Sequence, residues 1–289
     1  MKPQFIEDRI TQQGWMKPAE EALEKTAHAS VEHPPRLLKN FLHGTWLGHP
    51  LHSAIVHLPL GAFTVATILD IMDAGRRKAR YAPGADASVG IGLISATVAA
   101  TAGLADWSHT EQPARRVGVL HAVFNGTATL CYLASWLLRR REQRSAAMGM
   151  GIAGWLALMV GGYIGGRLTY THQIGVDHAQ REGPDEFTAI FPEGELPENE
   201  PHRAEINGVG ILLVKQRGRI FAIGERCAHM GGPLAEGKLE DGTIRCPWHG
   251  SRFRLEDGKV VEGPSAYSQP CFETRVRDGQ IEVRFAIKH

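Results

Sequence analysis

Cys227-Ala228-His229 is followed, after sixteen residues, by Cys246-Pro247-Trp248-His249. These two Cys–His pairs offer two thiolates and two imidazoles from two short segments of chain. Such a donor set suits a structural zinc ion in a tetrahedral site. It also suits a two-iron cluster in which two histidines replace the cysteines of one iron. A single residue between Cys and His is unusual for zinc, whose ligand pairs are spaced more widely. The pattern therefore favours the cluster.

The residues around both pairs resemble the two cluster-binding loops of Rieske proteins. The first loop is matched by 229–234 (His-Met-Gly-Gly-Pro-Leu), and the second by 246–253 (Cys-Pro-Trp-His-Gly-Ser-Arg-Phe). Gly263-Pro264-Ser265 resembles the proline loop that covers the cluster in that family. The resemblance spans about the last hundred residues. It implies one [2Fe–2S] cluster with four ligands: Cys227, His229, Cys246 and His249.

The resemblance is to ferredoxin-type Rieske loops. Rieske proteins of quinol-oxidising complexes carry an extra cysteine in each loop, joined as a disulfide, and a tyrosine near the cluster. This chain has Phe253 in place of that tyrosine and only four cysteines in all. The two outside the loops, Cys131 and Cys271, fall in an apolar stretch and in a predicted strand. Because hydrogen bonds to the cluster raise its potential, the resemblance implies a centre of lower potential than the quinol-oxidising class.

The chain from 186 to 287 has the pattern of an all-β domain. Short apolar runs such as 210–214 and 219–223 are separated by turn residues. Asp-Gly pairs at 241–242, 257–258 and 278–279 are typical hairpin turns. We expect small antiparallel sheets that hold the cluster between two loops.

Four apolar stretches precede this domain, and each approaches the ~20 residues that a membrane helix needs. They predict a four-helix transmembrane domain over 49–175, and a buried bundle of a soluble protein is the alternative. Residues 1–48 form a polar, partly amphipathic segment, suited to lying on a membrane or to docking on the β domain. The predicted spans are 53–72, 88–105, 117–138 and 146–168.

Motifs in these stretches resemble a family of uncharacterised four-helix bacterial membrane proteins (DUF2231-like). They are Gly48–Pro59, beginning Gly-His-Pro-Leu-His, then Gly103–Trp107 and Gly166–His172. The expected fold is multi-domain: a four-helix transmembrane bundle followed by an all-β Rieske domain.

The basic residues predict an orientation for this multi-pass cell-membrane protein. Arg76-Arg77-Lys78 and Arg139-Arg140-Arg141 flank the loops on one side, and short loops rich in Lys and Arg stay cytoplasmic. The Rieske domain follows the fourth span, on the opposite side. We therefore expect it on the non-cytoplasmic face. The cytoplasmic face is the alternative, because the loops resemble ferredoxin-type Rieske domains, many of which are cytoplasmic.

Histidines gather at the same end of the bundle as the Rieske domain. His57 and His121 each lie about one turn into a predicted helix, at similar depth. Polar groups inside a membrane are costly and usually functional, so these two are candidate axial ligands of a b-type haem. His52 and His172 are the next candidates. The alternatives are a zinc or copper site, or histidines that hydrogen-bond to one another and to the loops.

These features together predict a membrane-anchored one-electron carrier that relays electrons to a haem or metal site in the bundle. Its partners would be the lipid bilayer and a redox protein or the quinone pool. The alternatives are a ferredoxin-like component of a separate oxygenase or reductase system, and a redox sensor. The net charge of +1 gives no indication of nucleic-acid binding. No stretch is left for the mononuclear iron domain of an oxygenase, so we expect an electron-transfer component rather than a stand-alone enzyme.

Overall fold

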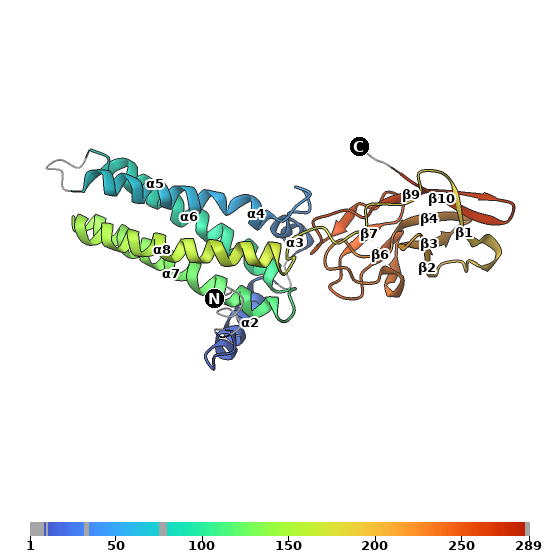
Figure 1. Ribbon diagram of the computed structural model, residues 1–289, viewed down its shortest axis with the longest axis horizontal. Helices are drawn as coiled ribbons and strands as arrows, with labels where there is room; N and C mark the ends of the chain where they lie inside the picture. The colour runs from blue at the N-terminus through green and yellow to red at the C-terminus, as the bar shows by residue number, and fades with distance from the viewer. Residues whose placement is uncertain (1–8, 10, 32–34, 75–79, 287–289) are drawn as a thin grey trace. The chain divides into compact units, whose positions relative to one another are not determined.

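The computed structural model describes residues 9, 11–31, 35–74 and 80–286, and these form two compact units. One unit is helical and comprises Met1–Pro34 and Leu51–Ile174. The other comprises Pro35–Pro50 and Gly175–His289 and contains every strand found among the described residues. Figure 1 shows the helical bundle and the strands of the β unit. The predicted order of a four-helix domain followed by a β domain is confirmed.

Four helical segments of the first unit are long and apolar enough to cross a membrane. The first, Leu51–Asp73, consists of α4 (Leu51–Ile55) and α5 (His57–Asp73). Pro59 explains the break between them, since proline cannot donate to the carbonyl four residues earlier and clashes with it. The other three are α6 (Ala82–Trp107), α7 (Ala114–Arg140) and α8 (Arg144–Tyr170). An additional helix, α2 (Met16–Val31), packs against α6 and α7.

Small residues let the bundle helices approach closely. Phe63 stacks on Tyr132, with ring centroids 3.9 Å apart and planes within 6°. A side chain at Gly92 would place its Cβ 2.4 Å from the Phe63 ring, so only glycine fits there. Such small-residue contacts are the usual means by which membrane helices pack, because lipid provides no hydrophobic drive to bring them together.

A buried ionic cluster joins the helices at the end of the bundle where α5 ends and α6 begins. Arg139 donates to both carboxylate oxygens of Asp70, and both side chains are buried. Arg139 Nη1 also donates to Asp86 Oδ1 at 2.8 Å, and Arg144 pairs with the same carboxylate. Each charge in this apolar surrounding thus has an opposite charge beside it, as burial requires.

Two antiparallel sheets make up the β unit. The larger has the strand order β1-β10-β9-β4-β3-β2 and the smaller β5-β6-β7-β8. Leu212, Val214 and Ile223 of the larger sheet share a buried core with Ile244 and Phe253 of the smaller one. The strands are β1 (Thr188–Pro192), β2 (Pro201–Ile206), β3 (Val209–Gln216), β4 (Arg219–Gly224), β5 (Lys238–Glu240), β6 (Thr243–Arg245), β7 (Arg252–Arg254), β8 (Val260–Glu262), β9 (Cys271–Arg277) and β10 (Gln280–Phe285).

The predicted Asp-Gly hairpins are present. Asp241-Gly242 joins β5 to β6, and Asp278-Gly279 joins β9 to β10. Both residues of these two pairs have positive φ, as a two-residue hairpin turn of this kind requires. The third predicted pair, Asp257-Gly258, lies in a longer loop between β7 and β8, and of its two residues only Gly258 has positive φ.

One helix of the β unit comes from the chain that precedes the first membrane span. This is α3 (Arg36–His43), which packs against β8. The polar segment 1–48 is therefore divided, with α2 in the helical unit and α3 in the β unit.

Candidate metal centre

Two loops of the same construction carry the predicted cluster ligands. The first follows β4 and the second follows β6. In the first, Gly231 donates its backbone N–H to the Cys227 carbonyl at 2.8 Å, and in the second Gly250 donates to the Cys246 carbonyl at 3.1 Å. Both glycines have positive φ, of 78° and 75°, a region in which glycine carries no steric cost. Each loop is thus a tight turn that brings its histidine back toward its cysteine.

The two sulfurs lie together in the core between the sheets. Cys227 and Cys246 are buried, and their thiols hydrogen-bond to each other. Backbone N–H groups of His229 and Met230 donate to the Cys227 sulfur, and those of Trp248 and His249 donate to the Cys246 sulfur. Each sulfur is therefore surrounded by donors that stabilise a thiolate.

These contacts shift the pKa values of the two thiols in opposite directions. The hydrogen bond from Cys227, helped by the backbone N–H groups and opposed by burial, lowers the pKa of Cys246 to about 7. The pKa of Cys227 is raised, because this thiol donates to Cys246 and is itself buried. In a metal site both sulfurs would act as thiolates, which is the form that binds metals.

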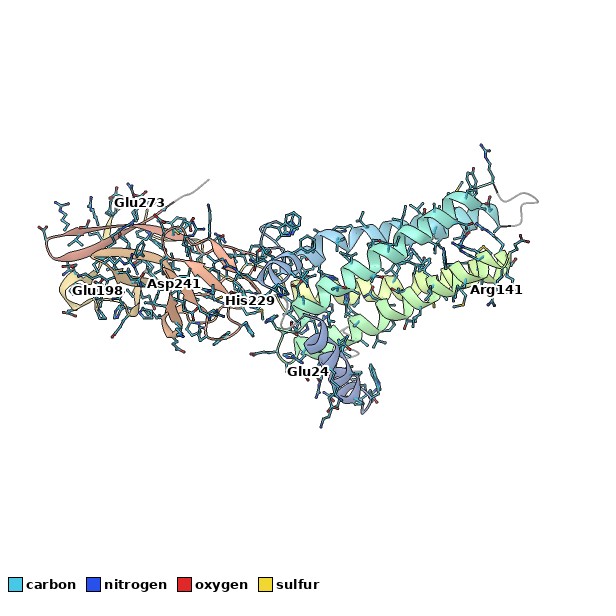
Figure 2. All side chains as sticks on the ribbon, turned by 180° about the vertical axis from the view of Figure 1, so that it is seen from behind. Glu24, Arg141, Glu198, His229, Asp241 and Glu273 are labelled. Atoms are coloured by element: carbon cyan, nitrogen blue, oxygen red, sulfur yellow. The ribbon has the colours of Figure 1, made fainter. Side chains whose placement is uncertain are left out.

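The two imidazoles lie nearer to the surface than the sulfurs. The rings of His229 and His249 are half-buried, with centroids 5.0 Å apart and planes at 85°. Figure 2 labels His229 on its loop. Beside them the Trp248 side chain is 54% exposed. The donors are thus arranged as an inner pair of sulfurs and an outer pair of rings.

The proline loop is fastened to the second of these loops. Ser265 donates its backbone N–H to Ser251 Oγ at 2.9 Å, and both serines are fully buried. Ser265 Oγ in turn donates to the Tyr267 carbonyl at 2.8 Å. The segment 263–265 is therefore attached to the second ligand loop. The hydrogen bond between the two serines was not visible from the sequence, because the residues are fourteen positions apart.

The donor set fits a [2Fe–2S] cluster of the Rieske type, with two cysteines on one iron and two histidines on the other. Gly232 supports this fit, because a Cβ at that position would lie 3.1 Å from the Cys246 sulfur. The glycine keeps the space beside that sulfur open. Among the described residues, no group of three or more His, Cys, Asp or Glu side chains meets at a single-ion site.

The remaining cysteines lie away from this site. Cys271 begins β9 and is packed in the core of the β unit. Cys131 lies in α7, in the other unit. All four cysteines are within the described residues, and none forms a disulfide.

In the helical unit, the structure brings together a different pair of histidines from the one that depth suggested. His121 lies beside His52, with ring centroids 6.2 Å apart and planes at 81°. His57 is exposed on the surface of the bundle, and half-buried His172 follows the end of α8. His52 and His57 are five residues apart, so they point to different sides of a helix. The sequence had indicated how far along the helices these histidines lie, but not to which side of the helix each side chain points.

Both rings of this pair are held by backbone carbonyls of neighbouring helices. His52 Nδ1 lies 2.8 Å from the Ala99 carbonyl oxygen, and His121 Nδ1 lies 2.9 Å from that of Gly161. Glycines make room for them. A Cβ at Gly103 would lie 2.8 Å from His52 Nδ1, and one at Gly165 would lie 3.0 Å from the His121 ring. These glycines belong to the small-residue pattern of the spans, but nothing in that pattern linked them to the histidines.

Two family models match the chain. The Rieske [2Fe–2S] domain matches residues 186–273, and the predicted membrane protein family DUF2231 matches residues 48–178.

Curated relatives match the Rieske part. The 3-phenylpropionate/cinnamic acid dioxygenase ferredoxin subunit of Escherichia coli K12 is 34% identical over 93 residues, covering 32% of this chain and 87% of that protein. Human apoptosis-inducing factor 3 is 33% identical over 90 residues, which is 31% of this chain but only 15% of the relative. Among solved structures, the ferredoxin of carbazole 1,9a-dioxygenase from Nocardioides aromaticivorans IC177 covers 35% of this chain and 98% of that chain, at 20% identity and a TM-score of 0.33.

Proposed function

Because this chain belongs to the Rieske [2Fe–2S] family and joins that domain to a DUF2231 membrane domain, we propose that it is a membrane-anchored one-electron carrier. The proposed ligands are Cys227 and Cys246 for one iron and His229 and His249 for the other. Bound there, the cluster would supply a one-electron donor and acceptor.

The arrangement of the four donors is the observation that carries this proposal. The buried cysteines keep water from the sulfur side, and their backbone N–H donors stabilise negative charge on the sulfurs. Such donors are one of the means by which a protein sets the potential of an iron–sulfur cluster. The half-buried rings of His229 and His249 leave the other side near solvent. Electrons would therefore enter and leave on the histidine side.

A redox protein is the partner that this surface favours. A relative that this chain covers over 87% of its length is named as the ferredoxin subunit of a dioxygenase. In this chain Trp248, 54% exposed next to His249, provides an apolar contact beside the outer imidazoles. Aromatic residues of this kind are enriched where proteins bind one another. The quinone pool is the alternative partner.

The order of the elements along the chain and the positions of the arginines support a location of the Rieske domain on the non-cytoplasmic face. The domain follows α8, so it continues from the end of the bundle opposite to the α7–α8 loop. That loop carries exposed Arg140 and Arg141, and basic loops stay cytoplasmic. Arg76, Arg77 and Lys78, the other basic group behind this orientation, lie outside the described residues.

A second redox site in the bundle is supported by one observation, the pairing of His52 with His121. A carbonyl that accepts from Nδ1 fixes the imidazole tautomer and makes Nε2 the ligand atom, which is how protein surroundings orient metal-binding histidines. In His121 this atom lies 3.3 Å from Asn125 Nδ2, so the Asn125 amide would have to turn away for a metal to bind. On this basis His52 and His121 are better candidates for a haem b or metal site than His57 or His172.

The test is spectroscopy of the purified full-length protein with iron, sulfide and haem assays. We expect the EPR signal of a reduced Rieske cluster, its loss in Cys227→Ser and its retention in the matched control Cys271→Ser. Zinc without a cluster signal, or loss of the cluster in Cys271→Ser, would contradict the ligand assignment. A haem band that is lost in His121→Ala, with the cluster retained, would support the second site. Absence of haem and of any other metal from the bundle would remove it.

A further inference from the structure

Helix α3 has its polar and apolar faces reversed relative to an ordinary surface helix. Positions 36, 39, 40 and 43 are spaced by three and four residues, so they share one face. They are Arg36, Lys39, Asn40 and His43. This polar face is turned to the β unit. The usual amphipathic helix instead turns its apolar face to the protein and its polar face to water.

The polar face binds the edge of the smaller sheet. The Arg36 guanidinium donates to the Val261 carbonyl at 2.8 and 3.2 Å, and Lys39 pairs with Glu262 at 3.2 Å. Asn40 Nδ2 also donates to the Val261 carbonyl, at 3.1 Å. Since β8 is the last strand of its sheet, these bonds occupy an edge carbonyl that no further strand covers.

The same face reaches the proline loop. Asn40 Oδ1 accepts from the backbone N–H of Gly263 at 3.0 Å. His43 is 2% exposed, and its ring lies 3.3 Å from where a Gly263 Cβ would be. The helix is thus attached to the residue that begins the proline loop.

The opposite face of α3 is apolar, and apart from buried Leu42 at its edge it is uncovered. Leu37 is 85% exposed, Leu38 46% and Phe41 48%. Trp46, just beyond the helix, is 60% exposed and stacks on Phe41 with centroids 5.8 Å apart and planes within 7°. Contiguous exposed apolar side chains of this size mark an interaction surface.

The chain itself indicates what covers this surface. Trp46 precedes Leu51, where the first membrane span begins, by five residues. An extended chain covers at most about 3.6 Å per residue, so Trp46 lies within roughly 18 Å of the start of the span. Tryptophan is enriched at membrane–water interfaces, and Leu and Phe are typical of helices that lie in the interface plane.

We propose that Leu37, Leu38, Phe41 and Trp46 lie in the headgroup region of the same bilayer that the bundle spans. The polar face of α3 would then hold β8 and the Gly263 loop at that surface, so the electron partner is met at the membrane. The proposal concerns the position of the Rieske unit and goes beyond its electron-transfer role.

The test uses tryptophan quenching by brominated lipid. The full-length protein is placed in phosphatidylcholine nanodiscs whose acyl chains are, or are not, brominated. Subtracting the emission of Trp46→Phe from that of the wild-type protein isolates the signal of Trp46. Trp136→Phe, a substitution inside the α7 span, gives the corresponding signal of an intramembrane tryptophan. The protein carries the same cofactors in brominated and in unbrominated nanodiscs. The ratio of its tryptophan emission in the two lipids therefore reports bromine contact alone.

We expect the Trp46 signal to fall in brominated nanodiscs, as the Trp136 signal does. Leu37→Asp combined with Phe41→Asp should abolish the loss at Trp46 while the EPR signal of the cluster persists. Equal Trp46 emission in both lipids would overturn the proposal. So would cross-linking of a Leu37→Cys variant between two copies in one nanodisc, because the surface would then be covered by a second chain. Loss of the cluster signal alone would count against the proposed function and not against the lipid contact.

Discussion

The side chain of Asn40 offers the sharpest test of the α3 contact, because one amide group serves two backbone partners. It donates to the Val261 carbonyl and accepts from the Gly263 N–H. Asn40→Ala removes both bonds without adding bulk. We expect the helix to open from the β8 edge more often, and the Gly263 amide to become accessible to water.

The losses of these two hydrogen bonds have different free-energy costs. The Val261 carbonyl keeps its two bonds from Arg36, so that acceptor remains satisfied. Gly263 is buried, and its N–H is left without its partner. An unsatisfied buried donor costs about 1–3 kcal/mol. A free-energy change of this size corresponds to roughly a 5- to 150-fold change in an equilibrium constant. We therefore expect amide exchange at Gly263 to accelerate by a factor in that range.

Hydrogen–deuterium exchange of the full-length protein, read by mass spectrometry on peptides across 259–266, measures this rate. Lys39→Ala is the matched control. It removes one ion pair to the same strand but neither of the bonds that Asn40 makes. Its effect on Gly263 should be much smaller. Unchanged exchange at Gly263 in a folded Asn40→Ala protein, or an equal effect of Lys39→Ala, would refute the reasoning.

Three further results are expected. Arg139→Leu leaves the buried Asp70 carboxylate without its main partner and should cost about 3–5 kcal/mol, seen as a lower thermal midpoint in detergent and partly restored by adding Asp70→Asn. Gly165→Leu should displace the His121 ring and destabilise the bundle by about 1–3 kcal/mol, as overpacking does. If His249 is a cluster ligand, the potential should fall at high pH by roughly 59 mV per unit, because the oxidised cluster favours loss of the imidazole proton, as voltammetry would record.

Each of these has an outcome that contradicts it. If adding Asp70→Asn to Arg139→Leu does not raise the thermal midpoint, the isolated Asp70 carboxylate is not the source of the lost stability. An unchanged midpoint in Gly165→Leu would mean that the His121 ring is free to move aside. A potential that stays constant into strongly alkaline solution would argue against histidine ligation.

The sequence predicted the fold because its signals are local. Each membrane span is a continuous apolar stretch, and the structure lengthens the predicted spans by a few residues at each end. The two ligand loops depend on Cys, His and Gly within five residues of one another, so their construction follows directly from their order. The Asp-Gly hairpins are likewise decided by adjacent residues.

What the sequence did not reveal depends on direction around a helix axis. His57 and His121 were predicted to lie at similar depth, but the ring beside His121 is that of His52, next to Gly103, and Gly165 lies next to His121. Helix α3 was not predicted as a separate element, and the ordinary rule for a surface helix would have turned its apolar face inward. The polar face of α3 turns inward instead, because it binds the Val261 carbonyl of β8 and the Gly263 N–H. These backbone groups lie more than 220 residues further along the chain.

That separation has a consequence for how the protein is made. Asn40 is synthesised 223 residues before Gly263, and all four membrane spans lie between them. At about 5–20 residues per second, translation takes roughly 10–45 s to supply the partner. During this interval α3 has no β unit to bind, and the nascent bundle is inserted first. The final contacts of the Rieske unit therefore form late in biogenesis, after the chain that separates its two pieces has been threaded through the bilayer.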